Sequence, residues 1–294
     1  MTGQRVSSGP SCTLDRVVDI DDSRRLTFAE YKAIDAVNWS TLKELRRSPL
    51  HFQHRLTNER EDRDVLRLGR VVHIAVFEPE RLPLDVAVWQ GGDRRGKDWK
   101  LFETLHWRQT IVNEKEYARV CAIRDAVRAC PLVQPYLAVG EPEKVITWTD
   151  RRSGVKMKAR LDWLGAVLLD LKTARYAVDA RRFAQEAFRL GYFHQLALYR
   201  RGVATALGLG QGPPALIVAV EPEGPHDIAV YRLSEDALAF VGEEVDELLE
   251  RLVTCRAEGK WPGTFNAEQE LEVPRWAMPN LDDVDVEDPD WLTE

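Results

Sequence analysis

The sequence predicts an α/β fold in which a central mixed β-sheet is flanked by helices, with a further helical layer at the N-terminus. Three observations support this class: helical signals fill the first part of the chain, consecutive strands fill 143–174, and helix, strand, strand and helix then follow. A chain of 294 residues is long enough for one large domain with an appended layer, or for two small domains. We expect a flexible lead-in at 1–30, a single domain at 31–280 and a tail at 281–294.

The N-terminal third carries helical patterns separated by breaks. We expect Ser40 to cap a short helix that Pro49 ends. Residues 65–80 repeat apolar side chains near the helical period up to a proline, which predicts a helix. Residues 81–100 contain a glycine pair and several bases, and they read as a loop outside the fold. The segment that begins at Asn113 reads as a long amphipathic helix.

The middle of the chain is rich in strands. Residues 143–150 and 155–164 both alternate polar and apolar side chains, and RRSG lies between them, so a hairpin with a four-residue connection is predicted. The mostly apolar segment 165–174 reads as the next strand. The remaining elements are predicted in the order of one or two helices over 179–208 broken near Gly191, strands in 214–224 and 226–234, and a capped helix over 234–261.

Charge is distributed unevenly along the chain. The segment 281–294 holds seven acids and no base, and the net charge of the whole chain is −7, so the rest is neutral overall. Basic clusters nevertheless occur within that neutral body, for example at 93–100 and 151–160. A nucleic-acid partner is recognised by a local basic patch, so the total charge does not exclude one. The tail is expected to be disordered and solvated; alternatives are competition with DNA or recruitment of a partner protein.

Cysteine usage and hydropathy indicate the cellular compartment and restrict the metal cofactors that the sequence could bind. Cys12, Cys121, Cys130 and Cys255 form no CxxC pair, which favours reduced structural thiols over a zinc or iron–sulfur site. No apolar run approaches the roughly 20 residues that span a bilayer. The N-terminus lacks the layout of a signal peptide. We therefore expect a cytoplasmic protein with no membrane partner.

The stretch LLDLKTA (168–174) places charges inside an apolar strand. Asp170 and Lys172 are two residues apart and so lie on one face, whereas Leu171 points the other way and offers its carbonyl oxygen. Asp162 precedes Asp170 by eight residues, and a turn around 164–166 would bring the two carboxylates face to face across neighbouring strands. Two carboxylates and a carbonyl suit Mg²⁺ or Mn²⁺. On spacing alone, a structural Asp–Lys pair at a sheet edge is the more frequent arrangement.

The motifs around this strand occur together and in order. They are LGRVVHIAVFEPE (68–80), EKVITWTDRRSGVKMKARLDWL (143–164), LLDLKTA, GYFHQLALY (191–199), and a final stretch from Cys255 to Met278. They resemble the G-x-x-x-H…EP helix, the E…W-x-D…G…K-x-R-x-D hairpin, the D-x-K-T strand, the Y-x-x-Q-x-x-x-Y helix and the C-terminal ending of RecE-type phage and prophage exonucleases. These enzymes, which include exodeoxyribonuclease VIII, belong to the PD-(D/E)xK nuclease superfamily. The resemblance implies a PD-(D/E)xK core.

The resemblance also implies roles for individual residues. His73, Asp162, Asp170 and the Leu171 carbonyl correspond to metal ligands, and Lys172 corresponds to the catalytic lysine. Glu143 corresponds to the supporting acid and fits the family spacing better than Glu141. Gln195 lines the catalytic site. The DNA-binding positions are expected to be Arg160, Tyr192, Tyr199, Arg94, Arg95 and Lys97, and Ser40, Arg47 and Ser48 are candidates for a terminal phosphate. Each polar or aromatic position has a structural alternative: ordinary packing for the helix face, and solvation for the strand and the loop.

The function that the resemblance implies is a metal-dependent exodeoxyribonuclease. Relatives of this type digest linear duplex DNA from 5′ to 3′ as closed rings, a trimer or tetramer here, and expose 3′ strands for a single-strand annealing protein in phage-type recombination. One alternative is a Cas4- or AddB-like nuclease, which the scattered cysteines disfavour. Another is a catalytically silent DNA-binding module on the same fold, which the intact acid and lysine set disfavours.

Overall fold

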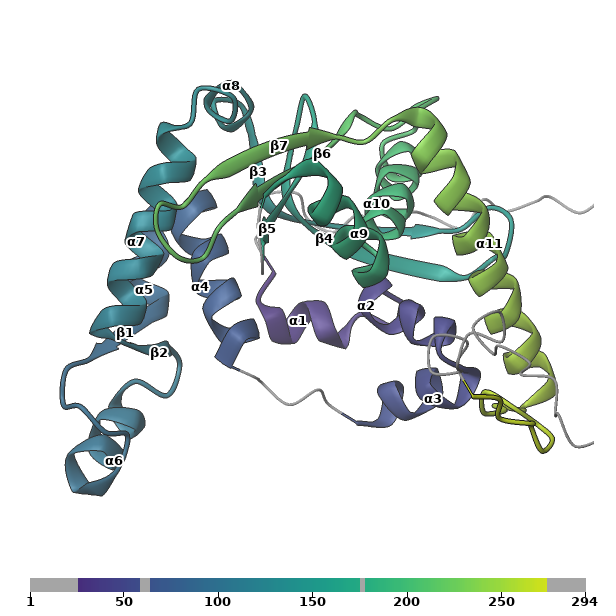
Figure 1. Ribbon diagram of the computed structural model, residues 1–294, viewed down its shortest axis with the longest axis horizontal. Coiled ribbons are helices and arrows are strands. Elements are labelled where there is room, and N and C mark those ends of the chain that lie inside the picture. The colour runs from purple at the N-terminus through teal and green to yellow at the C-terminus, as the bar shows by residue number, and fades with distance from the viewer. Residues whose placement is uncertain (1–25, 59–63, 175–177, 274–294) are drawn as a thin grey trace, which may run out of the picture.

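A five-stranded mixed sheet forms the centre of the protein in the computed structural model, which describes residues 26–58, 64–174 and 178–273 (Figure 1). Its strands lie in the order β3-β4-β5-β6-β7, in which β5 and β6 are parallel and the other neighbours are antiparallel. The bounds are β3 Gly140–Thr149, β4 Lys156–Gly165, β5 Leu168–Thr173, β6 Ala215–Val220 and β7 Ile228–Arg232. The predicted α/β class with a mixed sheet is confirmed.

The predicted hairpin is formed by β3 and β4. Thr149 pairs with Lys156 next to the turn, and Gly140 pairs with Gly165 at the far end, in one continuous register. In the turn, the Asp150 carboxylate accepts hydrogen bonds from the backbone N–H and the hydroxyl of Ser153. Local turn chemistry and alternating side chains therefore agree, which is why the sequence pattern identified this element.

β4 and β5 separate soon after their connecting turn. Their ladder consists of the pairs Trp163–Leu169 and Leu164–Leu168. Further along β4, the edge is taken by Val37 from the N-terminal layer, whose N–H donates to the Lys156 carbonyl at 2.9 Å and whose carbonyl accepts from the Lys158 N–H at 2.8 Å. The fork between β4 and β5 opens beside the predicted carboxylates.

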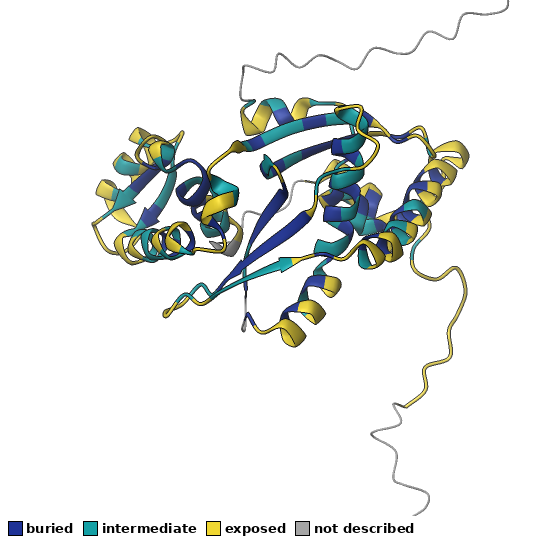
Figure 2. Cartoon of the chain, turned by 90° about the horizontal axis from the view of Figure 1, so that it is seen from above, coloured by how far each residue is buried: buried dark blue, intermediate teal, exposed yellow. Residues whose placement is uncertain are grey.

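Hydrophobic cores lie on both faces of the sheet. Every residue of β6 is buried; its alternate residues from Ala215 to Ala219 join one core, and those from Leu216 to Val220 join the other. Helices α10 (Tyr192–Ala206) and α11 (Glu235–Glu258) belong to the first core, and α4 (Asp64–Phe77) and α7 (Glu114–Ala129) belong to the second. Figure 2 shows the buried strands between helices whose outer faces are exposed. Coverage of both faces explains the uninterrupted apolar run of β6.

Gly191 separates α9 (Ala180–Leu190) from α10, as the sequence predicted. Its φ of +79° lies in the left-handed region, and a Cβ there would stand 2.7 Å from the Trp39 ring. Both facts require glycine. Ser234 caps α11, which agrees with the predicted capped helix.

The expected N-terminal helical layer is present, but two of its boundaries were predicted wrongly. It contains α1 (Phe28–Ala33), α2 (Trp39–Leu42), the 3₁₀ helix η1 (Lys43–Arg46) and α3 (Pro49–Thr57). Asn38, rather than Ser40, caps α2, and its side chain accepts from the Thr41 N–H. Pro49 begins α3 instead of ending a helix, because proline fits the first helical position, where no hydrogen-bonded N–H is needed.

Residues 81–100 were expected to form a loop, and this expectation was wrong in part. The strands β1 (Val86–Trp89) and β2 (Thr110–Asn113) pair in parallel, and α6 (Gly96–Leu105) lies between them in the chain. Short elements complete the connections: η2 (Pro79–Arg81), α5 (Leu82–Asp85) and α8 (Gln134–Leu137). Of these segments, β1, β2, α5 and α6 form an arm at the lower left of Figure 1. α6 buries none of its side chains, so its sequence shows no core-facing stripe.

The expected lead-in and tail fall mostly outside the described residues. The tail at 281–294 and residues 1–25 lie outside the described residues. Helix α1 begins at Phe28, so the expected lead-in to residue 30 extends into a helix. Within the described part of the chain, none of the helices is long and apolar enough to cross a membrane.

Candidate metal centre

The fork between β4 and β5 holds the two predicted aspartates. One carboxylate oxygen of Asp162, Oδ2, accepts the backbone N–H of Leu171 at 2.9 Å, so the strand that carries Asp170 fixes the orientation of Asp162. The Leu171 side chain is buried in the core as expected. Its carbonyl oxygen stays a predicted ligand. The neighbouring pair Trp163–Leu169 places Asp162 and Asp170 across from each other where the strands diverge, near enough for the Asp162 charge to act on Asp170.

His73 reaches Asp162 from α4. Its Nδ1 lies 3.3 Å from Asp162 Oδ1, and its ring meets the Phe77 ring edge to face one helical turn later. The helical motif therefore places its histidine at the site. A helical histidine is more often simply packed or exposed; here the ring packs on Phe77 and its Nδ1 also faces a carboxylate.

Glu143 joins the same group from β3. The pairs on either side of it, Pro142–Trp163 and Lys144–Leu161, place Glu143 opposite Asp162 in the hairpin register. Its φ of +53° is in the left-handed region, a conformation that costs a non-glycine residue about 1–2 kcal/mol. Within the described residues, ligand atoms of His73, Glu143 and Asp162 come within 4.8 Å of one another. We call these three side chains the cluster.

Asp170 and Lys172 form an ion pair beside the cluster. The Lys172 Nζ lies 2.6 Å from Asp170 Oδ2, and Gln195 donates from its amide to Asp170 Oδ1 at 3.0 Å. The same ammonium lies 4.7 Å from the centre of the Tyr192 ring. Asp170 is buried. The structure therefore brings Gln195 and Tyr192 to the site from α10, as the helical motif predicted.

The environment drives the pKa values of the two aspartates apart. Burial raises the pKa of Asp170 to about 6, and the Asp162 charge adds to this effect against the opposing charge of Lys172. Burial also acts to raise the pKa of Asp162, but the charge and hydrogen bond of His73, the Lys172 charge and the Leu171 N–H outweigh it and bring this pKa to about 2. Such divergence between neighbouring carboxyls is typical of catalytic sites.

The two bases are shifted in the same direction. Burial lowers the pKa of His73, yet the charge and hydrogen bond of Asp162 leave it raised above its ordinary value. Burial likewise opposes the charged form of Lys172, but Asp170 and Asp162 outweigh it and raise the pKa of Lys172. Lys172 is therefore a cation at neutral pH, suited to donating hydrogen bonds and stabilising negative charge.

The donor set fits a divalent cation. The cluster offers one imidazole and two carboxylates, and Asp170 adds a third carboxylate next to them. Carboxylate oxygen is the preferred ligand of Mg²⁺ and Mn²⁺, and imidazole also suits later transition metals. The residues that would hold the ion are His73, Asp162 and Glu143, and Glu143 was predicted only as a supporting acid. Asp170, a predicted ligand, lies outside this group, with its oxygens on Lys172 and Gln195, and stays a candidate for additional ligation.

Arg160 and Tyr199, both predicted to contact DNA, differ in how far they are exposed at the site. The Arg160 Nε contacts Glu143 Oε2 at 2.7 Å, and its side chain remains partly exposed. Tyr199 is buried in the core on α10, which suits a wall of the site better than a contact with DNA.

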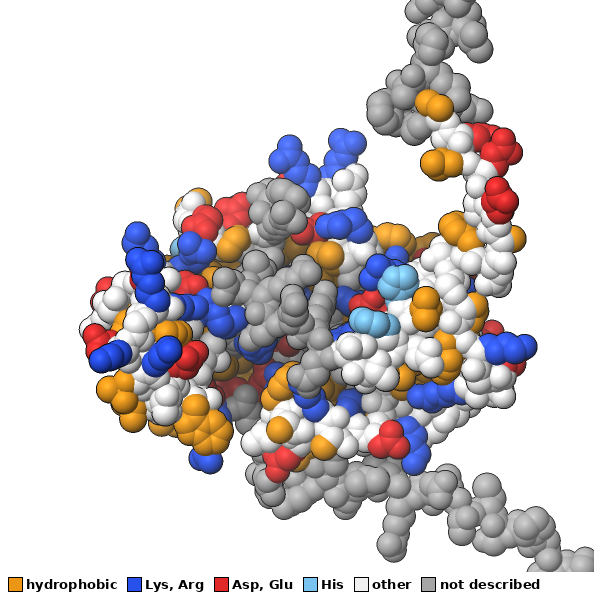
Figure 3. Space-filling model, turned by 90° about the horizontal axis from the view of Figure 1, so that it is seen from below, with side chains coloured by type: hydrophobic (Ala, Val, Ile, Leu, Met, Phe, Trp, Pro, Cys, Tyr) orange, Lys and Arg blue, Asp and Glu red, His pale blue; other side chains and the backbone are white. Residues whose placement is uncertain are grey.

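The three basic residues predicted for DNA contact lie on the arm. Arg94 is held by Glu116 at 3.1 Å and by the Trp99 ring. Arg95 and Lys97 are exposed, and Lys97 lies in the first turn of α6. Figure 3 shows several Lys and Arg side chains on the left-hand part of this face, interspersed with acidic and hydrophobic ones.

The residues proposed for a terminal phosphate are partly engaged elsewhere. Ser48 is buried, and its hydroxyl caps α3 and lies 2.6 Å from His51 Nδ1. The Ser40 hydroxyl donates to Asn38. Arg47 is exposed and lies 3.7 Å from Glu44.

One residue at the site was given no role by the sequence. Lys158 is the first basic position of the K-x-R-x-D stretch, and it is buried. Its alternation with Arg160 and Asp162 was the available signal, because every second residue of a strand points to the same face.

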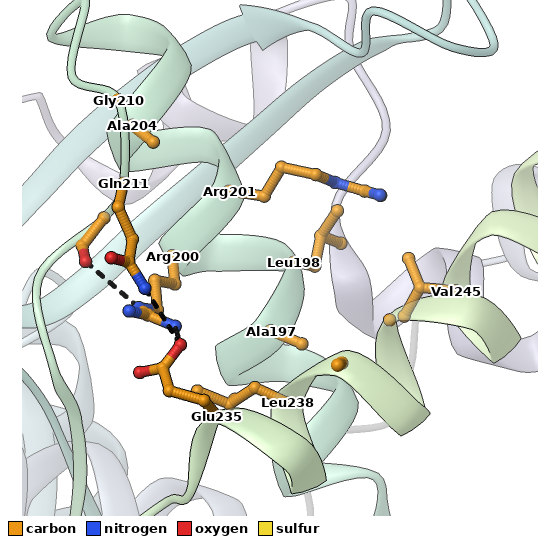
Figure 4. Close-up of a pocket in the computed structure, with 13 residues that line it drawn as sticks. Ala197, Leu198, Arg200, Arg201, Ala204, Gly210, Gln211, Glu235, Leu238 and Val245 are labelled. Carbon is orange, nitrogen blue, oxygen red and sulfur yellow. Dashed lines mark hydrogen bonds and ion pairs between the residues drawn. The ribbon is translucent and has the colours of Figure 1, made fainter.

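A further hollow lies between α10 and α11 and has a volume of about 320 Å³ (Figure 4). Its lining is mostly apolar, with Arg200 paired to Glu235 at 2.6 Å and Gln211 bonded to the same carboxylate. No cluster residue lines it. Its second base, Arg201, is paired with Asp150 and Asp246 outside the lining, so both arginines of the hollow are already engaged by carboxylates.

Comparisons with known proteins agree with the geometry. A solved structure of a candidate exonuclease from Eubacterium rectale aligns with a TM-score of 0.59 at 15% identity, over 85% of this chain and 96% of that chain, which shows a shared fold. The structure of SSO0001 aligns with a TM-score of 0.27 at 14% identity, over 71% of this chain and 84% of that one, which is too weak to carry an argument. No curated protein matches the chain.

The family is shown by the sequence of the domain. Residues 38–269 match the family described as "PDDEXK-like domain of unknown function (DUF3799)". The match includes the whole fork, the histidine of α4 and the polar face of α10. The chain therefore belongs to the DUF3799 family of PDDEXK-like domains, within the PD-(D/E)xK nuclease superfamily.

Proposed function

We propose that the protein is a divalent-metal-dependent nuclease that digests linear double-stranded DNA as an exodeoxyribonuclease. The observation that carries the proposal is the convergence of His73, Glu143 and Asp162 beside the Asp170–Lys172 pair at the fork. A purely structural ion pair at a sheet edge would need neither the histidine from α4 nor the strained glutamate of β3. A catalytically silent DNA-binding module would not require a histidine and two carboxylates held together beside a buried Asp–Lys pair.

The side chains around the cluster can divide the work of phosphodiester hydrolysis. A bound divalent cation would supply Lewis-acid polarisation of the phosphate and make a water molecule more acidic. Lys172, charged at neutral pH, can hold the attacking water or stabilise charge that develops on the phosphate. Gln195 keeps Asp170 in place through its amide bond at 3.0 Å. Arg160, partly exposed next to Glu143, is suited to a phosphate oxygen.

The finer assignment extends the resemblance of the sequence motifs to RecE-type enzymes. It comprises 5′ to 3′ polarity, a homo-oligomeric ring of three or four copies, an annealing protein as partner in phage-type recombination, and action in the cytoplasm. The exposed bases of the arm support contact with the DNA backbone, because phosphate contacts by Lys and Arg supply most nonspecific affinity.

The test is digestion of a linear duplex labelled at either the 5′ or the 3′ end, with a covalently closed circle in parallel, in the presence of Mg²⁺ or Mn²⁺. We expect loss of the linear duplex, early release of the 5′ label and no attack on the circle. Asp170→Asn and Lys172→Ala should abolish digestion while the protein stays folded. Cleavage of the circle would refute the exonuclease assignment, and near-normal digestion by either variant would refute the assigned site.

A further inference from the structure

Lys158 is a buried cation whose hydrogen bonds all go to backbone carbonyls. Its Nζ donates to the carbonyls of Tyr31 at 2.9 Å, Lys32 at 3.1 Å and Ile34 at 2.7 Å. These oxygens belong to the last turn of α1 and the residue that follows it. The carbonyls of Tyr31 and Ile34 each also accept a backbone N–H, so the lysine adds a second donor to them and complements the negative end of the helix dipole.

This contact fixes the N-terminal segment in the fork. The Tyr31 side chain is buried, and the Lys158 ammonium lies 5.0 Å from the centre of its ring. Val37 then adds its backbone to the edge of β4 that β5 has left. α1 has six residues and is too short to be stable alone, so its position depends on these contacts.

α1 in turn touches the cluster through Arg160. The Arg160 guanidinium lies 5.3 Å from the centre of the Phe28 ring, and its Nε holds Glu143 Oε2 at 2.7 Å. Arg160 holds one oxygen of Glu143, so it restrains the orientation of the carboxylate that lies with His73 and Asp162 in the cluster. Lys158, Arg160 and Asp162 alternate along β4 and connect α1 with the cluster.

We propose that α1 is a wall of the metal centre and that Lys158 is its positioning residue: by holding α1, it keeps Phe28 against Arg160 and thereby fixes the Glu143 carboxylate. The inference rests on the proposed function, because it concerns the same metal centre. It assigns a role in metal binding to residues that touch neither the ion nor the DNA.

The direction in which metal affinity changes on losing Lys158 distinguishes a positioning role from direct charge repulsion between Lys158 and the cation. Removing a positive charge near a cation site should by itself tighten cation binding, because less repulsion remains. Loss of a partner that orients a ligating carboxylate weakens metal binding, typically by 10–100-fold. We therefore expect Lys158→Met to bind Mn²⁺ about 10-fold more weakly than the wild type.

The experiment is titration of the full-length protein with Mn²⁺ by isothermal calorimetry, together with hydrogen exchange of segment 27–37. Lys156→Met is the matched control, because Lys156 is exposed on the same strand. Lys158→Met should weaken Mn²⁺ binding and speed exchange in 27–37, whereas Lys156→Met should change neither.

Phe28→Ala gives a second variant that leaves every charge in place. Phe28 is 49% exposed, so its truncation should cost little stability, and Phe240→Ala, at a residue 59% exposed on α11, is the control. Phe28→Ala should also weaken Mn²⁺ binding, by about 10-fold. If Phe28→Ala and Lys158→Met both bind Mn²⁺ as tightly as the wild type or more tightly, this inference is overturned and the proposed function is not affected. If Lys158→Met does not fold, the Mn²⁺ affinity of Phe28→Ala tests the inference by itself. A wild type that binds no Mn²⁺ overturns the proposed function and this inference with it.

Discussion

Metal binding to the cluster is expected to weaken steeply as the pH falls from 7.5 to 5.0. Carboxylates and imidazoles bind cations in their deprotonated forms, so every ligand that takes up a proton in this range competes with the metal. Asp162 stays ionised throughout, because its pKa is about 2. Asp170, whose pKa is raised to about 6, and His73 both titrate.

The size of the effect follows from the two titrations. At pH 5.0 a carboxyl of pKa about 6 is protonated about ten to one, which weakens binding about 10-fold. His73, whose pKa is raised by the charge and hydrogen bond of Asp162, adds to this loss by taking up a proton of its own. If both are ligands, the dissociation constant for Mn²⁺ should rise by more than the roughly 10-fold, or about 1.4 kcal/mol, that Asp170 contributes alone.

The assay is calorimetric titration with Mn²⁺ at pH 7.5, 6.5, 5.5 and 5.0 in buffers of different ionisation enthalpy, which count the protons released. Asp170→Asn provides the comparison, since it removes the carboxyl that titrates near pH 6 and should reduce the change to that of His73. An equal pH dependence in the wild type and Asp170→Asn would refute ligation by Asp170 and leave this side chain as the partner of Lys172.

Two further predictions concern the fold and the DNA. Gly191→Ala should lower the free energy of unfolding by about 2–4 kcal/mol in urea denaturation, because it strains a left-handed backbone and drives a Cβ into Trp39; Gly242→Ala, where a Cβ meets nothing within 4 Å, should be neutral or slightly stabilising. Lys97→Ala should weaken duplex binding and reduce the slope of log affinity against log salt by about 0.9. Arg94→Ala should reduce that slope less, because Arg94 is already paired with a carboxylate. A Lys97→Ala slope equal to that of the wild type would contradict contact between the arm and the DNA backbone.

The sheet and its flanking helices were predictable because local signals there agree with the tertiary structure. The β3–β4 hairpin alternates in its sequence and folds around an Asp150–Ser153 turn. Gly191 marks a break that only glycine tolerates. The motif residues His73, Asp162, Asp170, Lys172 and Gln195 meet because these elements are regular and their register follows from the turns.

Other features depend on contacts between distant segments and leave no local pattern. The arm pairs strands of four residues that are 20 residues apart in the chain, and α6 has no buried stripe. Asn38 caps α2 in place of the predicted Ser40; both residue types are favoured caps, so the local pattern does not separate them. The left-handed Glu143 and the carbonyl contacts of Lys158 arise only when β3, β4 and α1 are assembled.

The most direct measurement is the initial rate at which a linear duplex is digested by Glu143→Gln beside Glu141→Gln at saturating Mg²⁺. Both glutamates lie on β3, but Glu143 is buried in the cluster, and Glu141 is 63% exposed and paired with Lys144. We expect Glu143→Gln to lose about 10–100-fold in rate, which is the usual cost of removing a carboxylate that supports a metal site. Glu141→Gln should digest the duplex at the wild-type rate. Equal rates for the two variants would contradict a metal centre built from His73, Glu143 and Asp162.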